Sequence, residues 1–427
     1  MMEEFIIIYF IAILGIAMIY TKITHDLLNP LILFYTPLTV NFLLYYCLYR
    51  SESKLSQYTV LLIFLGSLSF LCGYSLTTMH HMKTKTQDVI YPLIINSKIK
   101  TVMLIFGIIG WFTGLYEFIY FGLNGISSFF INVRRNYMYG AGVSPISKYG
   151  TFVLFLASCV YLYDYCEKGG GKRKKYLLLF MVLGSVSSSC FSMARTTLLA
   201  YALAYAYIYL RGLIDKVYRK KMFSRKKIRR YYLVLCAGFI ILLLIFFLFV
   251  QKLGKAGAEK LFDKEFFLYK YLGYSLVAFD KYIKDFPGMT RGYYSLGAFG
   301  KILMLFGIYK RDMLENIGAP VGEFNVYSYM SSLYLDYGIL GLIFPMFLIG
   351  TLSGILYHKV QQRSGWWTIF YANFAYALVI AFYAYQFSNT TFIYCLFFMF
   401  ALSVHRGRFL VYAGKRKGYT YHDKGYE

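Results

Sequence analysis

Arginine side chains at three separated places could together bind an anion. Arg195 lies in Ser-Met-Ala-Arg-Thr-Thr, between two apolar stretches that are almost continuous. Arg134 and Arg135 stand together in Ile-Asn-Val-Arg-Arg-Asn-Tyr, and Arg291 stands in Met-Thr-Arg-Gly-Tyr-Tyr. Because guanidinium groups bind phosphate oxygens in a bidentate manner, a cluster of these arginines would suit a phosphate or pyrophosphate. Each arginine taken alone is weak evidence, because a loop arginine more often contacts water than a ligand and Arg195 could instead reach lipid headgroups.

A polar stripe that ends in a carboxylate is the second feature that could do chemistry. Read as a helix, the chain places Asn325, Tyr329, Ser332 and Asp336 on one face. If this helix enters a membrane, that face must contact protein or a water-filled cavity and not lipid. Asp336 could then accept a proton or pair structurally with an arginine or hydroxyl, and both interpretations stay open. Glu117 is a further candidate for a buried acid.

The composition requires these residues to be positioned by membrane helices. The 427-residue chain is 59% hydrophobic and only 15% charged, with a mean hydropathy of +0.52. A soluble protein carries about 25% charged residues, so this chain cannot cover a water-soluble globule of its size. Apolar runs of bilayer-spanning length recur along its whole length. The sequence therefore predicts an all-α, polytopic integral membrane protein and excludes a cytosolic enzyme.

Eleven membrane spans are predicted from the apolar runs. The chain is expected to form a single transmembrane domain over 1–427, with a large extracytoplasmic loop at 251–326 and a basic cytoplasmic tail at 405–427. The predicted spans are 5–20, 31–49, 58–76, 101–120, 149–165, 176–192, 196–210, 231–250, 338–357, 367–385 and 391–404.

The distribution of basic residues predicts which connections face the cytoplasm. Of the 45 Lys and Arg residues, 28 fall on one alternating set of connections and 6 on the other, apart from the long loop. The positive-inside rule then puts the N-terminus outside and the C-terminus inside. The basic run 216–230 becomes a cytoplasmic loop facing anionic lipid, which removes the main support for nucleic-acid binding.

Histidine and cysteine offer little metal chemistry on the outer face. The loop 251–326 carries 11 basic and 8 acidic residues and many aromatic residues, but no histidine and no cysteine. All six histidines fall on segments assigned to the cytoplasm, which argues against an outer zinc site or a histidine base. The seven cysteines form no CxxC pair, so no disulfide framework is indicated.

The layout resembles the Wzy-type oligosaccharide repeat-unit polymerases, the O-antigen and capsule polymerases of bacteria. The matching features are about eleven spans and one long outer loop before the third-last span. Two local patches also match: the Arg195 motif at the start of a span, and Asn325-Val-Tyr followed by Asp336-Tyr-Gly-Ile-Leu-Gly at the end of the loop. The family has Asp-Phe-Gly where this chain has Asp-Tyr-Gly, and the exchange keeps an aromatic residue.

The resemblance implies a GT-C-like glycosyltransferase of the bacterial inner (cytoplasmic) membrane. It would act on the outer face, with undecaprenyl-pyrophosphate-linked oligosaccharide as both donor and acceptor. The growing glycan would leave its lipid carrier and be transferred to a sugar hydroxyl of the incoming unit. Membrane lipids, a flippase and a chain-length regulator are the implied partners; no metal, cofactor or nucleic acid is implied.

Site roles follow from the same resemblance. Arg195 is expected to be the main pyrophosphate ligand, because a departing anion needs charge neutralisation. The attacking hydroxyl needs a base, and with no outer histidine the candidates are Asp336 and Glu323. The assisting pyrophosphate ligands are expected to be Arg135, Arg134 and Arg291, and the residues orienting sugar or phosphate oxygens are expected to be Asn325, Tyr327 and Tyr329.

Two other functions compete with this interpretation. An O-antigen ligase would move finished glycan onto a lipid core. Such ligases are expected to have a histidine in their outer loop, and the loop 251–326 of this chain has none. A flippase or transporter would need charged residues along a path through the membrane and commonly has internal repeats. The chain has no repeat in hydropathy between its halves. Polymerisation is therefore the favoured expectation.

Overall fold

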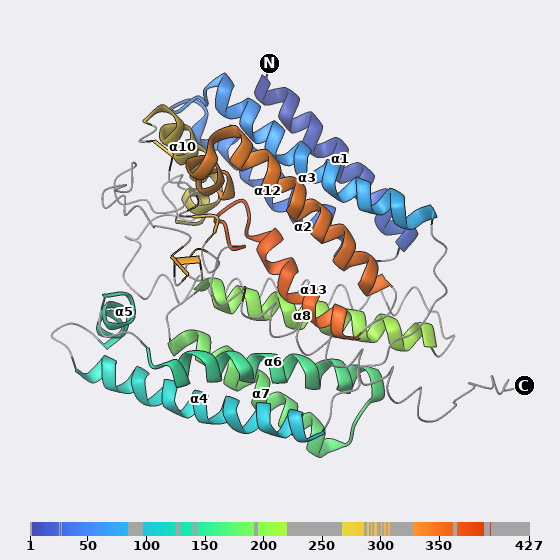
Figure 1. Cartoon of the computed structure of the whole chain (residues 1–427), viewed down its shortest axis with the longest axis vertical. Coiled ribbons are helices and arrows are strands. Elements are labelled where there is room, and N and C mark those ends of the chain that lie inside the picture. Colours follow the sequence, from blue (N-terminus) through green and yellow to red (C-terminus); the bar gives the residue numbers. More distant parts are fainter. Residues whose placement is uncertain are drawn as a thin grey trace, which may run out of the picture.

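The computed structural model (Figure 1) describes most of the chain, and all its described regular structure is helical. The described residues are 2–24, 26, 28–83, 97–124, 129–139, 143–191, 195–219, 267–285, 288–289, 292, 294–296, 300, 303–304, 306–307, 328–361, 365–387 and 393. The helices are α1 (Met2–Thr24), α2 (Pro30–Leu44), η1 (Tyr45–Tyr49), α3 (Gln57–Lys83), α4 (Ser97–Leu123), α5 (Phe129–Tyr139), α6 (Pro145–Lys168), α7 (Lys172–Phe191), α8 (Arg195–Arg219), α10 (Phe267–Lys284), α12 (Tyr329–Gln361) and α13 (Gly365–Val379).

The lengths of the apolar helices confirm the class of protein that the composition predicts, an α-helical membrane protein. Among the described helices, six are long and apolar enough to cross a membrane: α1, α2 continued by η1, α3, α4, α6 and α12. α7, α8 and the shorter α13 occupy the positions of three further predicted spans. Of the remaining two, 231–250 lies outside the described residues, as does the basic tail, and 391–404 is described only at residue 393. The chain is an α-helical membrane protein.

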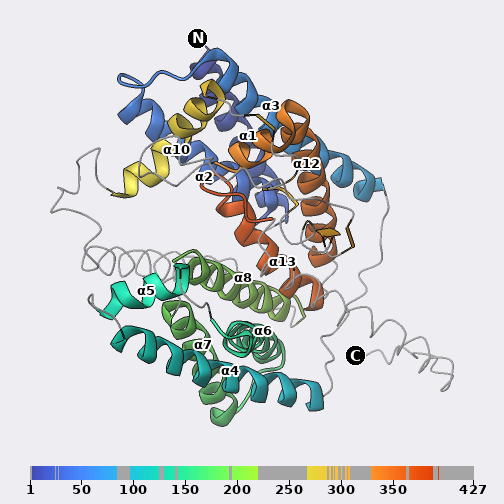
Figure 2. The same cartoon turned by 60° about the vertical axis from the view of Figure 1, so that its left-hand side comes forward.

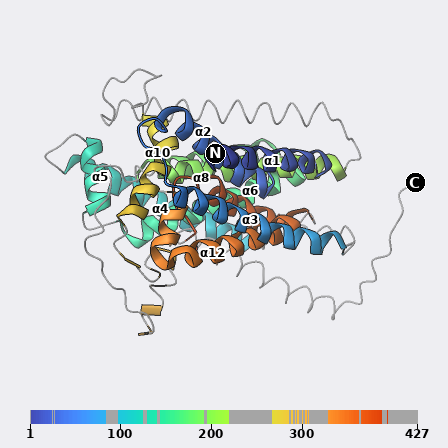
Figure 3. The same cartoon turned by 90° about the horizontal axis from the view of Figure 1, so that it is seen from above.

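The helices form two groups with α13 between them. Figures 1 and 2 show α1, α2, α3, α10 and α12 on one side and α4 to α8 on the other. α13 packs against α8 of one group and against α12 and α2 of the other. α3, α6, α8 and α12 all begin at the end of the molecule that carries α5 and α10 (Figure 3). We call this the α10 end; the distribution of basic residues predicts that it faces outward.

Glycines let the main helix pairs approach closely. A Cβ atom at Gly350 or Gly354 of α12 would overlap the Phe70 carbonyl or the Thr77 hydroxyl of α3. Gly350 and Gly354, which form a Gly-x-x-x-Gly pair, therefore lie on a helix-packing face. Gly110 of α4 meets Gly150 of α6 in the same way in the second group. Small residues permit this because packing, not hydrophobicity, holds helices together in lipid.

An amphipathic helix lies within the segment expected to be one long loop. α10 packs on α2 and η1 at the α10 end. The Asn41 amide of α2 donates hydrogen bonds to the Leu272 carbonyl and the Ser275 hydroxyl. On the next turns, the Asp280 carboxylate accepts the Ser56 N–H at 2.9 Å. Thus α10 is docked by polar contacts at both of these points.

Asp280 caps α3 from a different helix. Its carboxylate also accepts the Thr59 hydroxyl at 2.6 Å and lies 2.6 Å from the Lys284 ammonium group. Burial would raise the pKa of this carboxyl, but hydrogen bonds from Lys284, Thr59 and Ser56 outweigh it and hold the pKa below its usual value. The folded protein therefore favours the charged carboxylate.

Replacing Asp280 by asparagine should destabilise the protein by about 1–2 kcal/mol at neutral pH, because a charged cap is lost. Since the folded pKa is lowered, the carboxylate's contribution is complete above the ordinary carboxyl pKa and disappears as pH falls through the folded value. The apparent melting temperatures of wild type and Asp280→Asn in detergent should therefore converge in acid. Asp285→Asn, an exposed change at the end of α10, is the control. A constant difference at every pH would contradict the assignment.

Candidate functional site

Asp336 stands at a break in α12. Tyr337 (φ −146°, ψ 22°) and Gly338 (φ 63°, ψ −142°) have non-helical backbone inside the helix. The positive φ at Gly338 is a conformation that glycine adopts without the steric cost of a Cβ atom. The break therefore separates the first two turns of α12 from the long segment that crosses the membrane.

The carboxylate of Asp336 holds a turn that precedes α12 in the chain. Its Oδ1 accepts the N–H of Tyr294 at 3.1 Å, and its Oδ2 accepts the N–H of Ser295. The turn is closed by a 3.0 Å hydrogen bond from the Leu296 N–H to the Gly292 carbonyl. Because Asp336 is fully buried, these backbone donors satisfy a group that would otherwise be costly to desolvate. Asp336 thus has a structural partner of a kind that the sequence did not indicate.

Tyr337 and Gly338 also contact this part of the chain. Gly292 has φ 98°, and a Cβ atom added there would lie 2.6 Å from the Tyr337 hydroxyl. A Cβ atom at Gly338 would lie 3.4 Å from the terminal methyl of Met289. All three residues of the Asp-Tyr-Gly patch therefore meet one short segment. Arg291 lies outside the described residues, but it is the neighbour of Gly292 in the chain.

Two of the three predicted arginine sites belong to described helices at the α10 end. Arg195 is the first residue of α8, so the prediction that it begins a helix is confirmed. Arg134 and Arg135 lie on α5, and the Arg135 side chain is exposed. The side chains of Arg195 and Arg134 lie outside the described part of the structure. The backbone therefore brings the starts of α8 and α12 and helix α5 to one end of the molecule (Figure 1).

Of the predicted polar stripe, the structure describes the side chains of Tyr329, Ser332 and Asp336, and these three differ in burial. α12 begins at Tyr329, whose ring is buried with its centroid 5.8 Å from that of Phe34. Its hydroxyl has no hydrogen-bond partner within the described residues. Ser332 is partly exposed and Asp336 is buried. Tyr329 therefore packs inward against α2. The remaining predicted residues of this region, Glu323, Asn325 and Tyr327, lie outside the described residues.

A small pocket surrounds Glu117 near the ends of α4, α6 and α7. The Oε1 atom of Glu117 accepts the Ser144 N–H at 3.1 Å, at the N-cap of α6. The Oε2 atom is buried and has no hydrogen-bond partner among the described residues. The lining residues are Gly114, Glu117, Phe118, Phe121, Ser147, Thr151, Ser188 and Phe191. One lining residue, Phe191, is the last residue of α7 and stands four positions before Arg195 in the chain.

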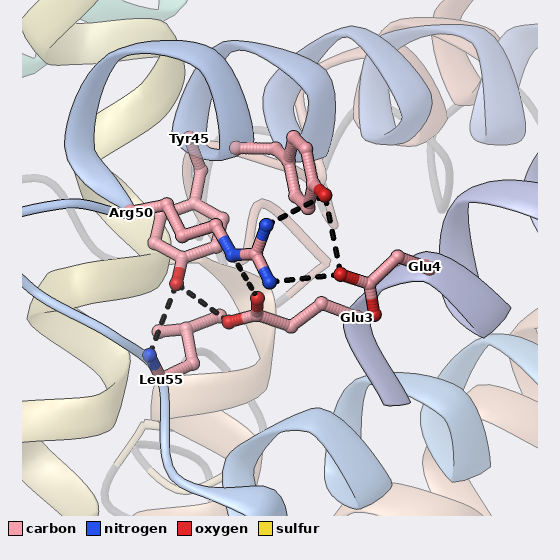
Figure 4. Close-up of polar contacts among 6 residues, drawn as sticks. Glu3, Glu4, Tyr45, Arg50 and Leu55 are labelled. Atoms are coloured by element: carbon pink, nitrogen blue, oxygen red, sulfur yellow. Dashed lines mark hydrogen bonds and ion pairs between the residues drawn. The ribbon is translucent and has the colours of Figure 1, made fainter. Parts of the chain in front are cut away.

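Arg50 forms a cluster that the sequence analysis did not identify (Figure 4). Its guanidinium lies 2.7 Å from a Glu3 carboxylate oxygen and 2.8 Å from one of Glu4. The Tyr45 hydroxyl donates to Glu3 at 2.8 Å and accepts the Leu55 N–H at 3.0 Å. The cluster ties the start of α1 to the end of η1. Arg50 is therefore engaged by two carboxylates, unlike an arginine held ready for phosphate.

A buried ion pair lies at the opposite end of the molecule. Arg211 of α8 is 3.6 Å from Asp26, which also accepts the Leu28 N–H at 3.0 Å and the Gln361 amide at 3.3 Å. Arg211 also donates to the Val360 carbonyl at 3.2 Å. These bonds join the α1–α2 turn, α8 and α12 across the two groups. The only sequence signal was a lone acid and a lone base near span ends.

No group of three or more His, Cys, Asp or Glu side chains that could hold a metal ion occurs in the described part of the chain. Polar contacts at the α10 end come from carboxylates, hydroxyls, backbone amides and the basic groups of Arg50 and Lys284. Comparison with protein-family models, with curated proteins and with solved structures found no match to this chain.

Proposed function

We propose that the protein is a glycosyltransferase that polymerises undecaprenyl-pyrophosphate-linked oligosaccharide units on the outer face of the bacterial cytoplasmic membrane. In this proposal the chain has about eleven spans, a GT-C-like arrangement and the large loop 251–326, with its N-terminus outside and its C-terminus inside. Donor and acceptor are both lipid-linked, so a membrane-embedded enzyme is needed to hold their polyprenyl chains.

One observation carries the proposal. At the α10 end, Asp336 beside the break in α12 accepts hydrogen bonds from the turn that follows Arg291 in the chain, and α8 begins there with Arg195. The exposed Arg135 of α5 lies at the same end. Cationic residues from three separate segments near one membrane surface are what recognition of a lipid pyrophosphate requires.

In the proposed reaction, a sugar hydroxyl of the acceptor attacks the anomeric carbon of the donor glycan. The bond from that carbon to the pyrophosphate oxygen breaks, and the carrier pyrophosphate leaves as an anion. Arg195, assisted by the other arginines, stabilises this charge. A carboxylate takes the hydroxyl proton. Since Asp336 accepts two backbone N–H groups, its geometry favours positioning the Arg291 segment, which leaves Glu323 as the stronger candidate for the base.

The glycan pattern of cells tests this function. Deleting the gene should leave a single repeat unit on the final acceptor, and restoring the wild-type gene should return a ladder of chain lengths on a gel. Full-length polymer retained on the carrier lipid would instead indicate a ligase. Unpolymerised lipid-linked units accumulating on the cytoplasmic side would indicate a flippase. Either of those outcomes would overturn the proposal.

Reporter fusions test the orientation on which the site depends. A reporter fused after Lys220 should be found in the cytoplasm, because this position follows the basic end of α8. One inserted between 288 and 289 should be accessible from outside. The reverse pattern would turn the α10 end toward the cytoplasm and remove its access to flipped, lipid-linked substrates.

A further inference from the structure

The Glu117 pocket presents several hydrogen-bond acceptors, one of them a carboxylate oxygen. Within the described residues, Glu117 Oε2 is buried and unpartnered. The Thr151 hydroxyl donates to the Ser147 carbonyl at 2.7 Å, and the Ser188 hydroxyl donates to the Ser185 carbonyl at 2.7 Å. Their protons are thus used within their own helices, and only their lone pairs remain for the pocket. A group that brings an O–H or N–H donor into this pocket would therefore satisfy Glu117 Oε2.

Aromatic side chains and Gly114 form the apolar part of the pocket. Phe118, Phe121 and Phe191 line it. Phe118 and Phe191 also pack on each other, with ring centroids 5.4 Å apart. A Cβ atom at Gly114 would lie 2.9 Å from the Ser147 hydroxyl oxygen, so glycine keeps that wall open. Aromatic faces beside hydrogen-bond acceptors suit a group with C–H and O–H bonds on neighbouring atoms, as a sugar has.

We propose that this pocket is a subsite for a sugar hydroxyl group of the lipid-linked acceptor, which donates its proton to a hydrogen bond with Glu117 Oε2. The inference rests on the proposed function and adds to it a residue that orients substrate. Its place fits that role, since Phe191 ends α7 and Arg195 begins α8 four positions later at the same end. Only a small hydroxyl-bearing part of the sugar enters.

The structural role of Glu117 can be separated from its binding role. In Glu117→Gln, the side-chain carbonyl can still accept the Ser144 N–H and keep the α6 cap. The atom facing the pocket becomes an NH₂ donor, which cannot accept the ligand hydroxyl. Glu117→Ala loses both functions. Thr151→Leu fills the pocket and removes a hydroxyl that bonds only within α6 among the described residues.

Asp164→Asn is the matched control. Asp164 joins α6 to Lys100 of α4 by a 2.8 Å ion pair, on the same helix pair as Glu117 but at the opposite end. Loss of this carboxylate perturbs the same helix packing without touching the pocket. Each variant is compared at equal abundance in the membrane.

The experiment measures binding and chain length together. The probe is the free repeat-unit oligosaccharide released by mild acid from the strain's own lipid-linked intermediate, titrated onto purified full-length protein. We expect Glu117→Gln and Thr151→Leu to bind it roughly tenfold or more weakly, as for loss of a hydrogen bond to a charged group, and to give shorter ladders in cells. Asp164→Asn should match wild type in both.

The outcomes separate the two proposals. If Glu117→Gln binds the probe and makes polymer like wild type while Glu117→Ala is defective, Glu117 is only a cap and the subsite is overturned. If wild-type protein binds the probe in a Glu117-dependent way but restores no ladder, the subsite stands and polymerisation fails. If wild type restores the ladder but Glu117→Gln binds as tightly, only the subsite fails.

Discussion

Replacing Arg195 by alanine is expected to abolish long polymer while the amount of protein in the membrane stays normal. Arg195 begins α8 at the α10 end, and the proposed reaction develops negative charge on a departing pyrophosphate there. Losing a preorganised group that stabilises developing charge slows catalysis by about 10²–10³-fold. The measurement is the glycan ladder of cells in which the variant replaces the wild-type gene.

Two further variants make the Arg195 result interpretable. Arg173→Ala removes an exposed arginine near the start of α7, at the opposite end of the molecule, and should leave chain length unchanged. Arg195→Lys keeps the positive charge but loses bidentate contact, so it should give intermediate chain lengths. Normal ladders in Arg195→Ala would remove this residue from the mechanism.

Gly350→Leu is expected to prevent stable folding. The Gly350 Cα packs on the backbone of Phe70, and even a single added carbon would overlap the Phe70 carbonyl. Leucine would force α3 and α12 apart along an interface that also contains Gly73 and Gly354. Overpacking commonly costs about 1–3 kcal/mol, and we expect more here because backbone atoms cannot move aside as a side chain can.

Gly15→Leu is the matched control for this change. Gly15 lies inside α1, and a Cβ atom added there meets nothing within 4 Å. Leucine has a higher helix propensity than glycine, so this variant should be at least as stable as wild type. Membrane abundance and the apparent melting temperature in detergent are the readouts. If both variants lost abundance and melting temperature equally, the cause would be the insertion of leucine into a membrane helix and not the close α3–α12 contact.

The positions of the helices were predictable because bilayer thickness sets a length that apolar runs must reach. Each of the nine predicted spans that fall within the described residues coincides with a helix. The glycine face of α12 was predictable for a similar reason, since close helix contact leaves small residues at a fixed spacing. Such signals are local, so one sequence suffices to read them.

Partners of single polar groups were not predictable. Asp336 was expected to take up a proton or to pair with an arginine or a hydroxyl, yet two backbone N–H groups about forty residues earlier bind its carboxylate. Such donors cannot be recognised from residue types, because every residue except proline carries a backbone N–H. The break at Tyr337 and Gly338, between the predicted stripe 325–336 and the predicted span 338–357, was also not predicted, because a glycine within a helix does not reveal whether its φ is positive.

Composition and hydropathy are enough to predict an α-helical membrane protein, and the distribution of basic residues predicts which end faces outward. Those properties depend on sums over many residues, so individual exceptions matter little. Tertiary structure decided which lone charges meet: Arg50 with Glu3 and Glu4, and Arg211 with Asp26. It also decided that Glu117 faces a pocket, because contacts between distant helices depend on how the helices pack and not on their order in the chain.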